Sequence, residues 1–361
     1  MNVPFLDLRA PYLELREEID EAISRVLGSG WYLQGPEVEA FEAEFAAYCG
    51  AEHCVAVGNG GDALSLILRG LGIGAGDEVI VPAHTFIATW LAVSETGATP
   101  VPVEPDPVTF TMDPALAEAA ITPRTRAILP VHLYGHPADL DALRAIADRH
   151  GLALVEDAAQ APGAVYNGQK IGASPSTVAF SFYPGKNLGA LGDSGAVVTS
   201  DRQLAEKVRL LRNYGSRVKY QHEVLGTNSR TDEIQAAVLR VKLPLLDEWN
   251  ARRDRVAERY LAGLKGLDLE LPNVASWAEH AWHLFVVRVA DRAGVAGRLE
   301  AAGVGTLVHY PVAVHSSPAY APLGLGPFPL SSRLADEVLS LPIGPHLTDD
   351  QVQQVIDAVG S

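Results

Sequence analysis

Short apolar segments alternate with helix-like segments along the first two thirds of this chain, and this alternation limits the fold more than any other feature. Residues 53–57 (HCVAV) are apolar and β-branched, whereas residues 35–50 (GPEVEAFEAEFAAYCG) place apolar side chains at helical spacing between a proline and a glycine. Apolar strands that are separated by helices form a mostly parallel sheet with helices on both faces. Further strands are expected at 77–82, 127–135, 152–157, 176–183 and 195–200, and further helices at 62–72, 139–151 and 202–215.

The character of the sequence changes near Leu245. Residues 245–264 predict one long charged helix, and a smaller α+β unit follows it to Ser361. We therefore expect an α/β protein with an N-terminal arm and large domain over residues 1–245 and a small C-terminal domain over residues 246–361. A chain of 361 residues is long enough for two such domains.

Charge and composition exclude several classes of protein. The net charge of −16 argues against nucleic acid as a partner, because phosphate backbones require clustered Lys and Arg. The chain holds two cysteines, Cys49 and Cys54, so we expect no disulfide framework, and with His53 they still lack the four ligands of a structural metal site. No apolar run is long enough to span a membrane, and no signal peptide is recognisable, so we expect a cytoplasmic protein without a metal.

A glycine-rich turn follows the first predicted strand. Gly58, Gly60 and Gly61 allow a sharp turn, and the helix that follows offers unpaired backbone N–H groups to a phosphate. Gly58, Gly60 and Ala63 also match the dinucleotide fingerprint G-x-G-x-x-G/A, which leaves a nicotinamide-dependent oxidoreductase as an alternative. That fold requires an acidic residue at the end of the next strand, where this chain has Pro-Ala-His.

Two other predicted strands end in charged residues. Glu156 and Asp157 end one apolar strand, and a carboxylate at the ligand-binding edge of a sheet requires a positive partner. Lys186 follows the next strand in the turn-forming stretch 180–195 (FSFYPGKNLGALGDSG). Pyridoxal phosphate needs a lysine for its aldehyde, a carboxylate for its ring nitrogen and a glycine-rich helix start for its phosphate. The three strand ends together therefore predict a pyridoxal phosphate site.

Several longer motifs extend this prediction. In order along the chain, these motifs are SGWYLQGPEVEAFEAEFA, GDEVIVPAHTFIATW, GATPVPVEPDPVTFTMDP, VEDAAQAPGA, FSFYPGKNLGALGDSGAVVT and GTNSRTDEIQAAVLRVKL. With these motifs the chain resembles the DegT/DnrJ/EryC1/StrS family of sugar aminotransferases over almost its whole length. The resemblance implies the aspartate aminotransferase-like fold of type I pyridoxal phosphate enzymes, with a mostly parallel central sheet and a smaller C-terminal α+β domain.

The resemblance also implies a role for each matching residue. Lys186 forms the Schiff base with the cofactor and carries the proton during amino transfer. Asp157 pairs with the ring nitrogen, Gln160 lies near the ring hydroxyl, and Phe86 stacks on the ring. The phosphate is bound by Gly60, Gly61 and Ser181, and by Asn228 of the neighbouring subunit in a homodimer with shared active sites.

The same resemblance extends to the substrates. The family transfers an amino group from L-glutamate to nucleotide-linked keto sugars. This chain is most similar to the branch that converts dTDP-3-dehydro-6-deoxyhexoses to dTDP-3-amino-3,6-dideoxyhexoses for antibiotics or surface glycans. Aminotransferases for 4-keto sugars or keto-inositols share the cofactor motifs and stay as alternatives. The expected sugar or nucleotide contacts are Tyr183, Lys219, Tyr220, His309 and Tyr310.

One further alternative and two histidines complete the predictions. A non-catalytic regulator that binds pyridoxal phosphate would share the fold, although the net charge of −16 and the lack of a fused DNA-binding segment count against it. His280 and His283 lie three residues apart, which is not the spacing of a metalloprotease motif, and we expect them to serve packing or partner contacts.

Overall fold

The structure is a computed structural model that describes residues 2–173 and 175–361. One extended segment at its centre joins two four-stranded sheets. In this segment β5 (Ala153–Leu154) pairs with β4 (Thr125–Ile128), and β6 (Glu156–Asp157) pairs with β9 (Thr177–Ser181), both in parallel. The strand orders β3 (Thr99–Val103)-β2 (Glu78–Pro82)-β4-β5 and β6-β9-β10 (Gly195–Thr199)-β1 (His53–Val57) therefore form one continuous sheet.

The direction of the strands follows their connections. β2 (Glu78–Pro82), β3 (Thr99–Val103) and β4 are parallel, as the alternating pattern predicts. β10 (Gly195–Thr199) is antiparallel to both β9 and β1 (His53–Val57). The connection from β9 to β10 has no helix, and without a crossover the chain returns in the opposite direction. The predicted α/β fold with a parallel sheet is confirmed, and β10 is its exception.

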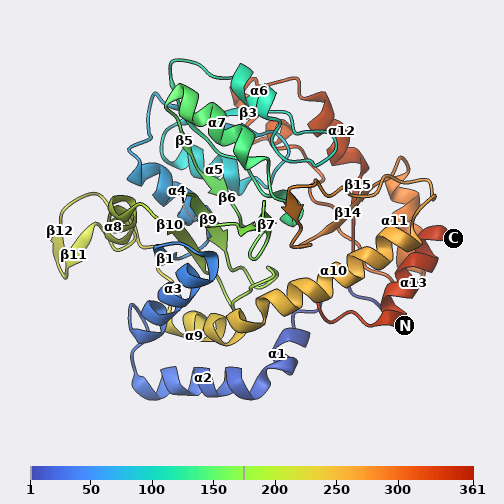
Figure 1. Cartoon of the computed structure of the whole chain (residues 1–361), viewed down its shortest axis with the longest axis horizontal. Helices are drawn as coiled ribbons and strands as arrows, with labels where there is room; N and C mark the ends of the chain where they lie inside the picture. The colour runs from blue at the N-terminus through green and yellow to red at the C-terminus, as the bar shows by residue number, and fades with distance from the viewer. Residues whose placement is uncertain (1, 174) are drawn as a thin grey trace.

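Helices cover both faces of this sheet (Figure 1). Alternate residues of each strand point to opposite faces, so Val55 and Val57 pack with α4 (Gly60–Gly70), α5 (Ala88–Glu95) and α8 (Arg202–Leu211). On the other face α3 (Pro36–Cys49) and α9 (Glu233–Lys242) cover β1, β10 and β9, and α7 (Leu140–His150) covers the parallel half. The aromatic ring of Phe45 contacts Phe180 edge-on, with 5.1 Å between ring centroids.

The C-terminal part begins with α10 (Leu246–Gly263), which runs from the sheet toward the two chain ends (Figure 1). It continues with an antiparallel pair, β14 (Phe285–Arg288) and β15 (Val338–Leu341), and with α11 (Arg292–Ala301), α12 (Pro329–Glu337) and α13 (Asp349–Gly360). The N-terminal segment joins this part, because Val3 forms a bridge with Val304 and lies in the same core. α10 starts where the sequence predicts a domain boundary, and the division into two domains stays a prediction.

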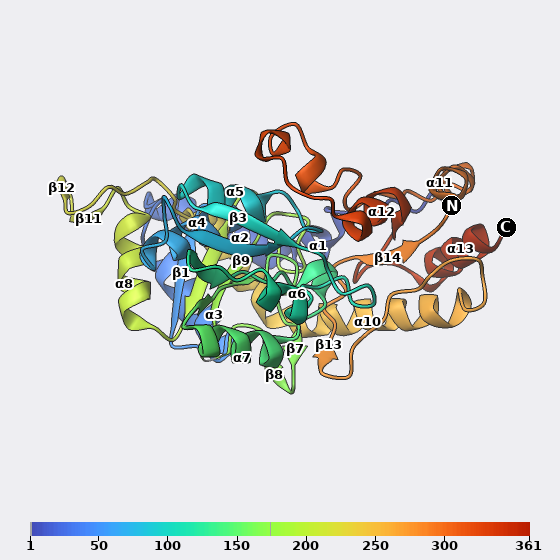
Figure 2. The same ribbon diagram turned by 90° about the horizontal axis from the view of Figure 1, so that it is seen from above.

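Short elements complete the fold. A hairpin projects from the body of the molecule, as Figure 2 shows from above. In the part of the chain that the structure describes, no helix is both long and apolar enough to cross a membrane, and no group of three or more His, Cys, Asp or Glu could hold a metal ion. The remaining α-helices and strands of the described residues are α1 (Ala10–Glu14), α2 (Arg16–Ser29), α6 (Pro114–Ala119), β7 (Val165–Tyr166), β8 (Gln169–Lys170), the hairpin strands β11 (Ser216–Val218) and β12 (Gln221–His222), and β13 (Ala278–Glu279).

Candidate active site

A cavity of about 550 Å³ opens where β6 and β9 end and α4 begins. These are the three places at which the sequence predicts functional residues, and the carboxyl ends of parallel strands are where such sheets bind ligands. The C-terminal part of the chain closes the other side of the cavity. The predicted site residues that line it are Gly60, Gly61, Phe86, Asp157, Gln160, Ser181, Tyr183, Lys186, His309 and Tyr310.

The start of α4 offers two free backbone donors to this cavity. The first N–H groups of a helix have no partner within the helix. Asn59 accepts from the N–H of Asp62 through its side chain at 2.8 Å and from the N–H of Ala63 through its backbone carbonyl. Among the described residues, no acceptor bonds to the N–H groups of Gly60 and Gly61, and both residues line the cavity. Together with the helix dipole, they favour an anion at this end.

Asp157 lies at the end of β6 with its carboxylate toward the cavity, whereas Glu156 points to the opposite face and contacts His132. The Asp157 side chain accepts hydrogen bonds from Thr89 Oγ1 at 2.9 Å and from the N–H of Ala159 at 3.1 Å. Burial raises the pKa of the Asp157 carboxyl above its ordinary value, and the two donors and the charge of Lys186 partly offset that rise. A cationic partner in the cavity would stabilise the carboxylate further.

Lys186 lies in the loop between β9 and β10. The loop is held by hydrogen bonds from the N–H of Lys186 to the carbonyl of Tyr183 and from the N–H of Ala190 to the carbonyl of Phe182, both at 2.8 Å. Burial lowers the pKa of the Lys186 ammonium to about 8, against the opposing charge of Asp157. Near neutral pH a larger fraction of this lysine is therefore free amine than of an ordinary lysine, and the free amine is the form that reacts with an aldehyde.

Gln160 is held in one orientation. Its Oε1 accepts from the N–H of Tyr134 at 2.5 Å, so its amide nitrogen must be the donor on the other side. That nitrogen donates to the Tyr310 hydroxyl at 2.8 Å. The second N–H of the amide is left for an acceptor in the cavity. The ring of Tyr310 also contacts Phe86, with 5.3 Å between ring centroids, so these aromatic side chains line one wall.

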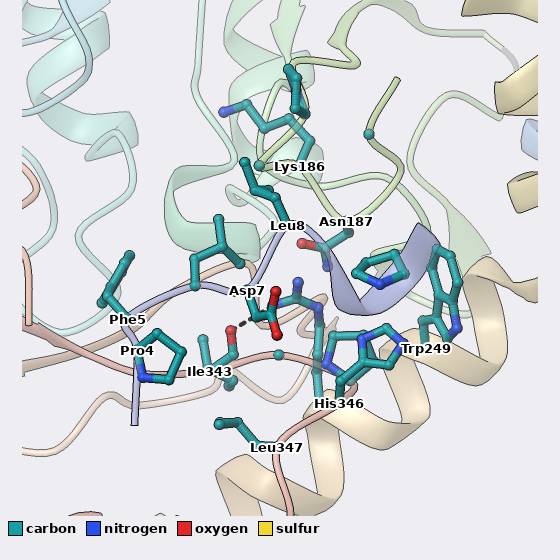
Figure 3. Close-up of a pocket in the computed structure, with 18 of the residues that line it drawn as sticks. Pro4, Phe5, Asp7, Leu8, Lys186, Asn187, Trp249, Ile343, His346 and Leu347 are labelled. Carbon is teal, nitrogen blue, oxygen red and sulfur yellow. Dashed lines mark hydrogen bonds between the residues drawn. The ribbon is translucent and has the colours of Figure 1, made fainter. Parts of the chain in front are cut away.

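A second cavity, of about 270 Å³, lies on the other side of the Lys186 loop (Figure 3). The N-terminal segment with Phe5, Asp7 and Leu8 covers it, and His346 lies on its far side. In Figure 3 the amine of Lys186 points away from His346 and Leu347. The lysine therefore presents its reactive end to the larger cavity and its stem to the smaller one.

Three predicted residues do not line the larger cavity of this chain. Lys219 and Tyr220 belong to the hairpin of β11 and β12, which projects from the body (Figures 1 and 2). Asn228 is exposed, and its neighbour Ser229 is tied to the start of α4 by a hydrogen bond to Asp62 at 2.6 Å. The expected role of Asn228 in a neighbouring subunit stays a prediction.

The donor set fits pyridoxal phosphate. Two free N–H groups at a helix start suit a phosphate, a carboxylate in need of a cation suits a protonated ring nitrogen, and an amine with a lowered pKa suits an aldehyde. A Cβ atom on Gly60 would lie 2.7 Å from Cβ of Ser181, so the backbone can approach at this end because residue 60 is glycine.

Comparison with known proteins decides the assignment. Residues 13–360 match the DegT/DnrJ/EryC1/StrS aminotransferase family. The chain belongs to this family. The family's aminotransferases depend on pyridoxal phosphate, so this protein is a pyridoxal phosphate-dependent aminotransferase. The predicted fold type I and the predicted cofactor are thereby confirmed.

The relatives are similar over nearly their full lengths. The chain is 68% identical over 359 residues to the erythromycin biosynthesis sensory transduction protein EryC1 of Saccharopolyspora erythraea, covering 99% of this chain and 98% of that protein. It is 64% identical over 361 residues to the dTDP-3-amino-3,4,6-trideoxy-alpha-D-glucose transaminase of Streptomyces venezuelae, covering 99% and 95%. The crystal structure of S. venezuelae DesV in complex with a ketimine intermediate superposes with a TM-score of 0.98 at 64% identity, covering 99% of this chain and 97% of that one.

The aminotransferase site also contains residues that the sequence did not point to. Asn59 caps α4, and Thr89, in the first turn of α5, donates a hydrogen bond to Asp157. His283, which we expected to serve packing or partner contacts, lines the cavity together with Lys186. The signal for Asn59 was present, because Asn is a preferred residue before a helix. Nothing in the sequence places His283 beside a loop that lies nearly one hundred residues earlier.

Proposed function

We propose that this aminotransferase moves an amino group from L-glutamate to C3 of a dTDP-linked 3-keto-6-deoxyhexose, in a homodimer whose active sites are shared. The observation that carries the proposal is the joint placement of Lys186, Asp157 and the free N–H groups of Gly60 and Gly61 around one cavity. The 64% identical relative named as a dTDP-3-amino sugar transaminase supports C3 as the position of amination.

Each of these residues has a separate proposed role. When bound, the cofactor supplies an electron-withdrawing ring, which makes it easier to remove a proton from the carbon that carries the amino nitrogen. Asp157 would keep the ring nitrogen protonated, and Gly60, Gly61 and Ser181 would bind the phosphate. Gln160, through its remaining N–H, and Phe86, through its aromatic side chain, would help to hold the ring. Lys186 would hold the cofactor between reactions and, as a free amine, would take up and return the proton.

Polar and aromatic side chains at the outer part of the cavity would receive the sugar. Tyr183 is exposed, and Tyr310 and His309 come from the C-terminal part of the chain. His309 Nδ1 is in hydrogen-bond contact with Ser340 Oγ at 2.8 Å, which fixes its ring. Burial lowers the pKa of His309 to about 4, so this ring is neutral at physiological pH and can share a hydrogen bond with a sugar hydroxyl.

The exposed apolar side chains support a homodimer. Trp31, Tyr32 and Leu33 are consecutive and all exposed. Tyr220 and Leu225, on and beside the projecting hairpin, are exposed to 82% and 91%. Exposed apolar side chains grouped in this way are typical of a surface that another protein covers. A second copy of the chain would cover them and bring Asn228, Lys219 and Tyr220 to the partner's cavity.

The regiochemistry is tested with defined substrates. The purified protein is incubated with L-glutamate and either a dTDP-linked 3-keto- or 4-keto-6-deoxyhexose, and the product is analysed by NMR. We expect a 3-amino sugar from the 3-keto substrate, with a 3-keto 4-deoxy analogue also accepted. Lys186→Ala is the control without activity. Faster conversion of the 4-keto sugar, or no conversion of any sugar in the panel, would contradict the proposed substrate, and the latter result would favour the regulator.

Shared active sites are tested by subunit mixing. Lys186→Ala and Asn228→Ala homodimers are prepared separately, mixed under conditions that exchange subunits, and assayed. If Asn228 serves the partner's site, a mixed dimer carries both defects in one site and leaves the other intact, so activity reappears. Absence of recovered activity despite mass-spectrometric proof of mixed dimers would refute the sharing.

A further inference from the structure

His283 makes one hydrogen bond whose polarity can be worked out from the neighbouring amides. The chain of contacts starts at the carbonyl of Pro162, which can only accept, and Asn250 Nδ2 donates to it at 3.0 Å. Oδ1 of Asn250 is therefore an acceptor, and Asn187 Nδ2 donates to it at 2.8 Å. The same nitrogen of Asn187 also donates to the carbonyl of Ala281 at 2.7 Å, so both of its hydrogens are used.

This chain of amides fixes the tautomer of His283. Asn187 Oδ1 is left as an acceptor, and it contacts Nδ1 of His283 at 3.2 Å. Nδ1 must therefore carry the hydrogen, because an imidazole nitrogen without one cannot donate. In the neutral ring the other nitrogen, Nε2, then has a lone pair and no hydrogen. No group in the described residues bonds to Nε2, and the ring lines the larger cavity.

The ring is also kept neutral and fixed in place. Burial lowers the pKa of His283 well below its ordinary value, and the positive charges of Lys186 and Arg253 and the rings of His309 and His280 lower it further. Arg253 Nη1 holds the backbone, since it donates to the carbonyl of Trp282 at 3.1 Å. The ring therefore cannot respond to a positive neighbour by moving away or by becoming protonated near neutral pH.

Lys186 is that positive neighbour. It lines the same cavity as His283, and the residue next to it in the chain, Asn187, carries the bond to the ring. The loop that positions the amine thus positions the acceptor as well. The other titratable groups whose charges act on these two side chains are Asp157, which acts on Lys186, and Arg253, His280 and His309, which act on His283.

We propose that His283 is a positioning residue for Lys186: its Nε2 lone pair accepts a hydrogen bond from the lysine ammonium while Lys186 holds the proton during amino transfer. This inference rests on the proposed role of Lys186. No bond to carbon changes at His283, and the proton stays on the lysine. A neutral acceptor stabilises the ammonium without competing for its proton, and it directs the amine toward the cavity.

Two variants separate the acceptor from the packing of the ring. His283→Asn keeps a nitrogen donor in place of Nδ1, so the bond to Asn187 is retained while Nε2 is lost. His283→Gln instead places an amide oxygen near the position of Nε2. His346→Asn is the matched control, because that ring lines the smaller cavity on the other side of the Lys186 loop and bonds to Glu14.

The decisive readout is the pKa of the Lys186 amine in the full-length, cofactor-free protein, measured from the pH dependence of its reductive methylation. A hydrogen bond to a charged group predicts that His283→Asn lowers this pKa by about one unit, a tenfold change in the acid dissociation constant. His283→Gln restores most of the shift, and His346→Asn leaves it unchanged. An unchanged pKa in His283→Asn would overturn the inference.

Two further readouts separate this inference from its competitors. Nitrogen-15 NMR of the histidine-labelled protein is expected to show a pyrrole-like Nδ1 and a pyridine-like Nε2 for His283, and the reverse would overturn the tautomer. In the holoenzyme we expect kcat to fall in His283→Asn with KM for the nucleotide sugar unchanged. A rise confined to KM would show that Nε2 binds the sugar instead, and a cofactor found on another lysine would refute the proposed function rather than the histidine assignment.

Discussion

Replacing Gly60 with alanine is expected to damage the phosphate end of the site, whereas the same change at Gly61 is expected to be tolerated. The two glycines are consecutive at the start of α4 and have the same free N–H. A Cβ on residue 60 would lie 2.7 Å from Cβ and 3.3 Å from Cα of Ser181. On residue 61 its nearest neighbour would be Asn59 Oδ1 at 3.3 Å, so a shift of a few tenths of an ångström would be enough to restore ordinary contact.

The magnitude follows from these distances. Carbon atoms pack at about 3.5–4.0 Å, so Gly60→Ala requires a shift of roughly 1 Å between α4 and β9. Overpacking of this kind costs about 1–3 kcal/mol. The shift moves the N–H groups away from Ser181, so we expect a similar loss in cofactor affinity, about 5- to 150-fold in Kd. Gly61→Ala is expected to change either quantity by less than about 0.5 kcal/mol, because no backbone must move.

Two measurements test this pair. The free energy of unfolding of the cofactor-free proteins is obtained by urea denaturation, and Kd for pyridoxal phosphate by equilibrium dialysis. Gly60→Ala is expected to lower both the free energy of unfolding and the affinity for pyridoxal phosphate, and Gly61→Ala is expected to change neither. Equal behaviour of the two variants would refute it, because helix propensity and backbone entropy affect both positions alike.

Three further results are expected. Asp157→Asn should lower kcat/KM about 10- to 150-fold because a charge-assisted hydrogen bond is lost, and Thr89→Val, which removes one donor to Asp157, should have a smaller effect in the same assay. In the cofactor-free protein, burial lowers the pKa of Lys186 from 10.5 to about 8. The unfolded chain therefore binds the extra proton between these values. Between these pH values the free energy of unfolding should therefore rise with pH by on the order of 1 kcal/mol more than that of Lys186→Met. The expected difference is small because the cavity admits water. Urea denaturation at several pH values measures it, and the same pH dependence in both proteins would contradict the expectation. Tyr310→Phe removes the acceptor of Gln160 Nε2, so Kd for the cofactor measured by dialysis should rise about fivefold, and an unchanged Kd would show that Gln160 does not act on the cofactor.

Much of this architecture can be predicted from the sequence because it follows from local rules. The alternation of apolar strands and helices predicts the layered fold, and the helix that ends at His150 with Gly151 behind it is where the pattern predicts it. The antiparallel direction of β10 was missed, because both directions present the same apolar face to the core. The signal that was available is the connection itself, since 182–194 is too short and too rich in glycine for a crossover helix.

Some features of the site could likewise be predicted from the sequence, and others could not. Lys186, Asp157 and the glycines near residue 60 could be predicted, since each follows a strand and their chemistry fits one cofactor. The orientation of Gln160 and the tautomer of His283 could not, because each is set by hydrogen bonds to residues far away in the chain. The contact between Asn187 and His283 joins positions 96 residues apart, and no periodicity or spacing encodes it.

The proposed function requires that Lys186 holds the cofactor and releases it when the amino donor arrives. Borohydride reduction of the purified holoenzyme, followed by proteolysis and mass spectrometry, tests this before and after addition of L-glutamate. We expect a pyridoxyl group on Lys186 within residues 180–195 before glutamate is added, and its loss afterwards. Modification of a different lysine, or a modification at Lys186 that glutamate does not diminish, would contradict it.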